Sequence, residues 1–202
     1  MIKDITCSYM NKIEYFSDID YIKAKIYYHI APTLKGLKPS SIVTLTKDKR
    51  DLCSLWDLYK NQILLDCGLD YFELKRDDQS INVMVYNKSY LIRTIHNSNN
   101  LDFLFQYGYY KSMNLNEILN RLKQRFVNVC PHEVGIFLGY PIEDVKDFIK
   151  HPKKPCLITG YWKVYNDLDY AEKKFKSFDK AKINVMMDIM NGFNFTNKNY
   201  LN

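Results

Sequence analysis

The sequence has 202 residues, of which 47% are apolar and 26% charged, with only seven Gly and six Pro. This length fits one domain, and the composition excludes disordered and fibrous chains. The formal net charge is +6, and no apolar run approaches the roughly 20 residues that cross a bilayer. We therefore expect a globular cytoplasmic protein with no membrane partner.

The first half of the chain predicts two amphipathic helices and three short strands. Ser17 followed by Asp20 is typical of a helix N-terminus, and apolar residues then recur at spacings of three and four. Pro32 is expected to end this helix, and Gly68 to end the second one. Two strands that flank a polar turn are typical of a β-hairpin. The predicted helices span 17–31 and 52–67, and the predicted strands span 41–46, 71–75 and 81–86.

The middle of the chain predicts three helices without strands between them. Two short helices are expected over 90–95 and 100–107, separated by an asparagine-rich loop. Asn114 and Glu117 then form a capping signal in front of an apolar stripe that reaches Val129. The third helix is therefore expected to be the longest of the three.

Two prolines are expected to open the next helices. Pro131 begins a helix over 131–138, Gly139 forms the turn, and Pro141 begins another helix. After these come a predicted strand, the final helix and a frayed tail, over 157–165, 168–190 and 193–202.

These elements predict an α/β protein of the α+β kind. We expect one mixed domain over 1–192, mostly helical, with a small sheet that includes one β-hairpin. The final helix is expected to turn Phe175, Phe178, Val185 and Ile189 toward the core.

Positive charge is concentrated near the C-terminus. From Lys146 to Lys182 the sequence holds ten Lys and five acidic residues, a net charge of +5. A Lys-rich surface attracts acidic proteins or nucleic acid. The five cysteines are odd in number and form no CxxC pair, which indicates reduced thiols and no metal site. The sequence identifies no cofactor.

Residues 132–149 have the spacing of a helix-turn-helix unit. Gly135, Gly139 and Val145 fall where such units need a small residue, a turn glycine and a core aliphatic residue. The second helix would, however, present acidic side chains to DNA, which its phosphates repel. These acidic residues are Glu143, Asp144 and Asp147. We therefore expect no nucleic-acid partner, and the segment is left as either a packing unit or a recognition unit.

Cys130, His132 and Glu133 are the candidate catalytic residues. A thiol at a helix N-terminus can become a nucleophilic thiolate, and neighbouring His and Glu side chains can act as acid and base. The structural alternative has Pro131 opening a helix, with Glu133 in its first turn and His132 bonded to backbone groups. His132 lacks the second His of a zinc-binding HExxH motif, so no metal site is predicted.

A cluster of aromatic residues in the predicted strand 157–165 forms the second candidate site. Alternation places Tyr161, Lys163 and Tyr165 on one face of the strand and Trp162 on the other. Aromatic side chains beside Lys can stack on a base, a flavin or a sugar. We take these four as candidate ligand-binding residues, with packing into the core as the alternative.

Three stretches of the sequence together resemble an uncharacterised domain-of-unknown-function family, number 3793, found mainly in clostridia and related anaerobes. They are His29–Leu34 with Gly36 and Lys38–Pro39, Pro131–Glu133 with Phe137–Val145, and Gly160–Tyr165. The resemblance spans nearly the whole chain and implies a single-domain bacterial protein of unassigned activity. An aromatic residue usually precedes Pro-His-Glu in this family. Cys130 stands there instead, which argues against an essential thiol.

The resemblance also implies a partner class. Members of the family are sometimes encoded near flavodoxin or iron-acquisition genes, which suggests a link to redox or iron metabolism. Flavodoxins are acidic, and a Lys-rich surface would steer an acidic protein into a transient encounter. The expected partner is therefore an acidic protein such as a flavodoxin.

Three hypotheses about function follow. The leading one is a non-hydrolytic binding or accessory protein, because the sequence shows no phosphate-binding loop, nucleophile elbow or metal quartet. The first alternative is an enzyme or redox protein that uses His132 and Glu133, or Cys130. It requires these side chains to converge on one pocket, and Tyr161 or Trp162 in the pocket wall would favour it. The second alternative is nucleic-acid binding.

Overall fold

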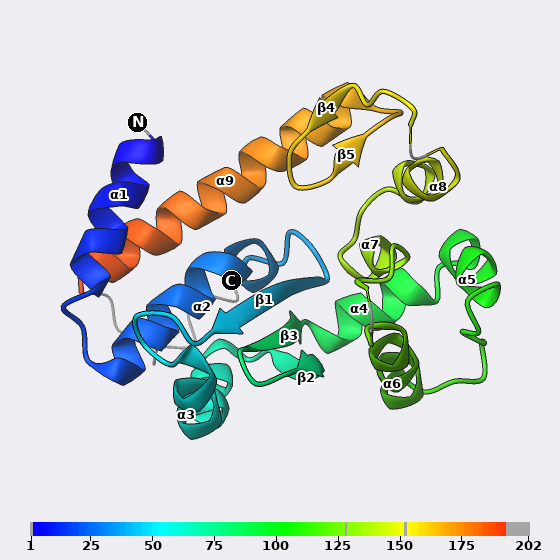
Figure 1. The fold of residues 1–202 in the computed structure, drawn as a ribbon. Helices are drawn as coiled ribbons and strands as arrows, with labels where there is room; N and C mark the ends of the chain where they lie inside the picture. Colours follow the sequence, from blue (N-terminus) through cyan, green and yellow to red (C-terminus); the bar gives the residue numbers. More distant parts are fainter. Residues whose placement is uncertain (1, 128, 152, 193–202) are drawn as a thin grey trace.

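A three-stranded antiparallel sheet lies at the centre of the molecule, between two groups of helices (Figure 1). The computed structural model describes residues 2–127, 129–151 and 153–192. The sheet has the strand order β1–β3–β2, and β2 and β3 form the predicted hairpin. Asp77 fixes the hairpin turn, since its carboxylate accepts hydrogen bonds from the backbone N–H groups of Gln79 and Ser80. The strands are β1 (Ser40–Thr46), β2 (Asp70–Arg76) and β3 (Ser80–Tyr86).

Alternate residues of β3 face different helices. Ile81, Val83 and Val85 pack into a core that contains residues of α1, α2, α3 and α9. Met84 and Tyr86 pack on the opposite face, in a core formed with α4 to α8. Because successive side chains of a strand point to opposite faces, one strand serves both cores.

The first group consists of four helices that cover one face of the sheet (Figure 1). They are α1 (Ile2–Ile13), α2 (Asp18–Leu34), α3 (Leu52–Cys67) and α9 (Leu168–Met190). The predicted Ser17 cap is confirmed, and Gly68 ends α3 in the left-handed conformation with a φ of 64°. Helix α1 was not predicted from the sequence. Its buried Tyr9 and Ile13 are four residues apart, and the Tyr9 hydroxyl donates to the carbonyl of Ala24.

Pro32 does not end α2, contrary to the sequence prediction. The helix continues to Leu34, with Pro32 buried inside it. A proline removes only one N–H donor, and the turns around it keep their bonds. Lys35 donates its backbone N–H to the carbonyl of Ala31, and Leu37 donates to that of Pro32.

The second group contains five shorter helices. They are α4 (Lys88–Ile95), α5 (Ser98–Phe105), α6 (Leu115–Arg125), α7 (Val134–Phe137) and α8 (Ile142–Lys150). The capping box of Asn114 and Glu117 is confirmed at the start of α6. The prediction that the apolar face of this helix reaches Val129 is wrong, because α6 ends at Arg125 and Val129 is exposed.

The helix predicted over 131–138 is shorter than expected. Only Val134–Phe137 is helical, and the residues before it form turns. Val134, Gly135 and Ile136 each donate to the carbonyl three residues earlier. These tight bonds hold Pro131, His132 and Glu133 outside the helix.

The strand predicted over 157–165 is instead a tight hairpin. Its strands are β4 (Ile158–Thr159) and β5 (Lys163–Val164). Gly160 forms the bend, where any Cβ would collide with the ring of Phe175. The predicted alternation holds from Tyr161 to Val164, where Trp162 and Val164 are buried and Lys163 is exposed, but it fails at Tyr165, which is buried as well.

The predicted α+β class, mostly helical with a small sheet that includes one β-hairpin, is confirmed, and the β4–β5 hairpin is a second one outside that sheet. The hairpin β4–β5 packs against α9 through a third apolar cluster that contains Trp162 and Phe175. The domain bounds 1–192 stay a prediction, and the predicted tail 193–202 lies outside the described residues. Within the described chain, no helix combines the length and apolar character needed to cross a membrane.

Candidate functional site

The two candidate sites of the sequence meet at one pocket. Its volume is about 330 Å³, and it lies between α7, α8 and β5. Cys130 and His132 line it from one segment, and Trp162 and Lys163 from the other. The remaining lining residues are mainly apolar and come from the segment before α7, from α7, from the turn after it and from α8. They are Val129, Pro131, Val134, Gly135, Tyr140, Asp144, Val145 and Phe148.

Close packing of α7 on α8 forms the floor of this pocket. A Cβ on Gly135 would lie 2.8 Å from a methyl group of Val145, so only glycine permits this approach without a shift. Gly139, with a φ of 75°, forms the turn between the two helices and fits against Pro39. Residues 132–149 are thus tightly packed against one another and against the start of β1.

Asp144 joins α8 to the β4–β5 hairpin. It is 3% exposed, and its Oδ2 accepts a hydrogen bond of 2.7 Å from the indole Nε1 of Trp162. Its Oδ1 accepts from the backbone N–H groups of Tyr165 and Asn166 and from the Asn166 side-chain amide. A buried carboxylate needs several donors, and this one has four. In the helix-turn-helix hypothesis, which the sequence already disfavoured, Asp144 would face DNA, whereas in the structure it is buried.

Trp162 is a wall of the pocket. It is 8% exposed and stacks on the ring of Tyr140, with ring centroids 5.1 Å apart. It also makes a T-shaped contact with the ring of Phe175, with a centroid distance of 4.6 Å. Both the ring and the indole N–H of Trp162 are therefore engaged by neighbouring residues.

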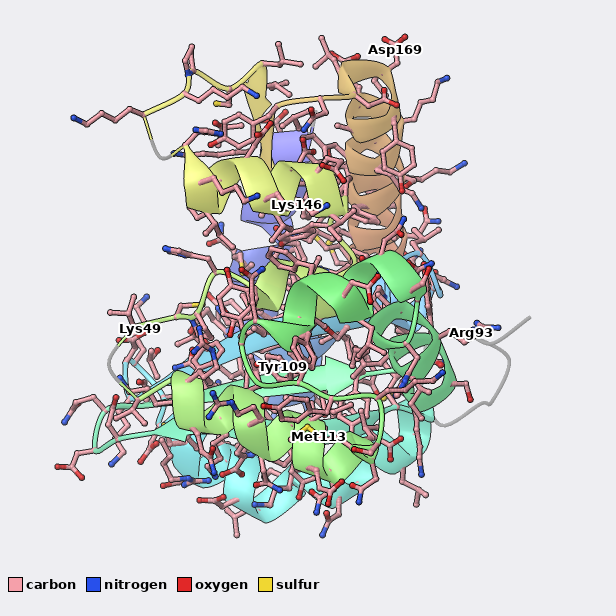
Figure 2. All side chains as sticks on the ribbon, turned by 90° about the vertical axis from the view of Figure 1, so that its right-hand side faces the viewer. Lys49, Arg93, Tyr109, Met113, Lys146 and Asp169 are labelled. Carbon is pink, nitrogen blue, oxygen red and sulfur yellow. The ribbon has the colours of Figure 1, made fainter. Side chains whose placement is uncertain are left out.

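The adjacent residues His132 and Glu133 point in different directions. Glu133 is 1% exposed, forms an ion pair with Arg125 and accepts a 3.4 Å hydrogen bond from the Tyr109 hydroxyl. It does not line the pocket. His132 is exposed, and its ring meets the edge of Phe148 at a centroid distance of 4.9 Å. Figure 2 shows Tyr109 between α5 and α6, in the helical end of the molecule that holds this ion pair.

Cys130 reaches the pocket as a free thiol. Its partly buried surroundings raise the pKa of the thiol above its usual value, and the charge of Glu133 raises it further. The thiol is therefore protonated at neutral pH. This arrangement differs from a reactive cysteine, whose surroundings lower the pKa.

The other aromatic candidates lie away from the pocket. Tyr161 faces α9, where its hydroxyl donates a 2.8 Å hydrogen bond to Asp179. Tyr165 is buried, with the Lys154 ammonium 5.5 Å from its ring centre. Lys163 is exposed, and its Nζ lies 5.5 Å from the ring centre of Phe148. The structure thus brings together Trp162 and Lys163, but neither Tyr161 nor Tyr165.

The excess positive charge lies near the pocket. Five Lys and one acidic residue occur between Lys146 and Lys163, whereas α9 holds five Lys and four acidic residues. Figure 2 shows Lys146 on α8, which lies above α5 at this end of the molecule. Over 2–127, 129–151 and 153–192, no three His, Cys, Asp or Glu side chains are grouped as metal ligands would be.

One comparison with known proteins identifies relatives of the chain. The family model described as "Protein of unknown function (DUF3793)" matches residues 26–197. The matched region includes the sheet, the pocket and most of α2 and all of α9. No curated protein and no solved structure matches the chain.

Proposed function

The chain belongs to the DUF3793 family, and we propose that it is a binding protein whose pocket holds an apolar group with an anionic end. The observation that carries this proposal is the composition of the pocket wall. Val134, Val145, Phe148 and Trp162 supply an apolar surface, on which the hydrophobic effect favours an apolar occupant.

The polar groups of the pocket favour an anion. His132 and Lys163 are exposed and line the pocket, so they lie at its rim. Asp144 is the only carboxylate among the described lining residues, and both of its oxygens are already engaged by four N–H donors of the protein. An occupant with an apolar body in the pocket and a carboxylate, sulfonate or phosphate at the rim fits both surfaces.

A pair of fluorescent probes tests this preference. 1-Anilinonaphthalene-8-sulfonate and N-phenyl-1-naphthylamine share one apolar body, and only the first carries an anion. We expect the sulfonate to bind more tightly than the neutral probe. In Lys163→Gln the ratio of the two affinities should fall by roughly three- to tenfold. Lys153→Gln is the matched control, because Lys153 is exposed and does not line this pocket. Equal loss in both variants, or equal binding of both probes, would refute an anion site.

We further propose that an acidic protein, such as a flavodoxin, docks beside the pocket. Lys150, Lys153 and Lys163 are exposed and have no ion pair among the described residues. Charge of this kind speeds association, and the effect weakens as salt rises. Lys150→Glu with Lys153→Glu should weaken flavodoxin binding, whereas Lys49→Glu in the β1–α3 loop should not. If flavodoxin binding changed neither with salt nor in the double variant, the proposal of an acidic protein partner would be wrong.

An enzyme is the second candidate, and one observation favours it. His132, Cys130 and Trp162 line the same pocket, which is the convergence that an enzyme of this type requires. His132 would be its acid or base without help from Glu133, which pairs with Arg125. Turnover of a bound ligand that disappears in His132→Gln would establish the enzyme and displace the binding protein. Native mass spectrometry and an absorbance spectrum of anaerobically purified protein would identify that ligand.

A further inference from the structure

Lys38 is a buried amine without a counter-ion. It lies between α2 and β1 and is 7% exposed. Among the described residues it has no hydrogen bond and no ion pair, and its Nζ keeps a small contact with solvent because it is not a fully buried atom. A largely buried charge without a counter-ion is poorly solvated, which disfavours the protonated amine.

The surroundings of Lys38 favour the neutral form of its amine. Its Nζ lies 5.3 Å from the ring centre of Tyr140 and 5.9 Å from that of Phe178. Burial, followed by the positive charge of Lys182 on α9, lowers the pKa of Lys38 to about 7. Its charge therefore changes within the physiological pH range.

Other titratable groups near Lys38 are already engaged. Asp179 accepts the hydroxyl of Tyr161, so it is not a free counter-ion for Lys38. The ammonium of Lys182 lies 4.8 Å from the ring centre of Tyr161 and 5.1 Å from that of Tyr28. The remaining neighbour, Tyr140, keeps its proton because burial raises its pKa to about 12.

A continuous set of contacts joins Lys38 to the pocket. Tyr140, which contacts Lys38, also stacks on Trp162, and both rings line the pocket. Trp162 is in turn bonded to Asp144 of α8. Lys38 therefore contacts one ring of the pocket wall directly and is separated from Trp162 by that single ring.

We propose that Lys38 makes the pocket proton-responsive: the protonated amine holds Tyr140 by a cation–π contact and favours an anionic occupant, and the neutral amine releases both effects. This inference rests on the proposed binding function and adds its regulation. By linkage, the anion must bind more tightly at pH 6 than at pH 8, and its binding must favour protonation of Lys38.

The first experiment needs no ligand. The chain has two Trp, so Trp56→Phe leaves Trp162 as the only indole reporter. Its fluorescence is expected to change with a midpoint near pH 7 and to lose this change in Lys38→Met. If Trp56→Phe fails to fold, the difference between wild type and Lys38→Met, each with both Trp, gives the same signal. A titration unchanged by Lys38→Met overturns the proposal.

The second experiment measures the coupling with 1-anilinonaphthalene-8-sulfonate. His132 lines the same pocket at its rim, so all measurements use the His132→Gln background, which leaves Lys38 as the variable under test. We expect binding roughly three- to tenfold tighter at pH 6 than at pH 8 with Lys38 present. Lys38→Met should bind the probe at both pH values with the weak affinity expected at pH 8. Lys38→Arg should bind it at both pH values with the tight affinity expected at pH 6.

The outcomes separate this proposal from the proposed function. A probe that binds with the same pH dependence in Lys38→Met and in its parent overturns the coupling and leaves the binding function intact. A probe that binds at neither pH, in wild type as well, overturns both. Flat, weak binding in Lys38→Met and flat, tight binding in Lys38→Arg support the coupling.

Discussion

The carboxylate of Asp144 accepts the indole N–H of Trp162 across 2.7 Å and so fastens the β4–β5 hairpin to α8. Asp144→Ala would leave that indole and the backbone N–H groups of Tyr165 and Asn166 without acceptors. We expect a loss of about 2–4 kcal/mol in the free energy of unfolding, measured with urea. Glu143→Ala, at an exposed neighbour, should cost under about 0.5 kcal/mol. Equal losses would contradict the role assigned to Asp144.

The Glu133 ion pair should matter for stability, and His132 should matter for probe binding. Removing Arg125 with Arg125→Met leaves the buried Glu133 carboxylate unpaired and should destabilise the fold by about 3–5 kcal/mol. Folded Arg125→Met protein should nevertheless bind the anionic probe with unchanged affinity. His132→Gln should weaken probe binding and leave the urea midpoint in place. If both Arg125→Met and His132→Gln weakened probe binding without lowering stability, Glu133 and His132 would belong to one binding site, contrary to this account.

The buried Lys38 should make stability depend on pH in a defined direction. Its pKa is about 7 in the folded state and 10.5 in the unfolded state, so between these values only the unfolded chain holds the proton. The penalty is complete below pH 7 and disappears as the pH rises toward 10.5. Lys38→Met should therefore be more stable than wild type by on the order of several kcal/mol at pH 6, and by less at pH 9. Urea unfolding at both pH values measures the difference, and a gap that grows with pH would refute the assignment.

Two glycines with positive φ offer a matched test of the packing around the pocket. A Cβ at Gly139 would lie 2.5 Å from Pro39, whereas Gly36 has nothing within 4 Å of that position. Their φ values are 75° and 64°, so Ala is strained at both. Gly36→Ala should cost about 1 kcal/mol, and Gly139→Ala about 1–3 kcal/mol more because of the collision. Thermal and urea unfolding would show this order, and a reversed order would contradict the packing described here.

Most of the fold could be read from the sequence because its signals are local. The Asn114 capping signal, the turn between β2 and β3, and Gly68 each lie within a few residues of what they determine. The hairpin at Gly160 was missed because its cause is distant: the ring of Phe175, on α9, fills the space that a side chain there would need. Helix α1 was not predicted, although Tyr9 and Ile13 are spaced four residues apart, as on one face of a helix.

The candidate site could be predicted only in part. His132, Cys130, Trp162 and Lys163 were singled out from their chemistry, and the structure places them around one pocket. Asp144 was missed because a carboxylate near a helix N-terminus is normally solvated, and its donors lie some twenty residues later. No local pattern could reveal that partnership, although a Trp near buried strand residues does require an acceptor for its N–H.

The measurement that tests the binding function most directly is probe binding to a chain whose pocket has been filled. Val129 lines the pocket and is 69% exposed, so Val129→Trp can fold and occlude the pocket. Val127 is 65% exposed and does not line it, which makes Val127→Trp the matched control. We predict that 1-anilinonaphthalene-8-sulfonate binds to wild type and to Val127→Trp with equal affinity, and at least about tenfold more weakly to Val129→Trp. Equal binding to all three proteins would show that the pocket between α7, α8 and β5 is not the binding site.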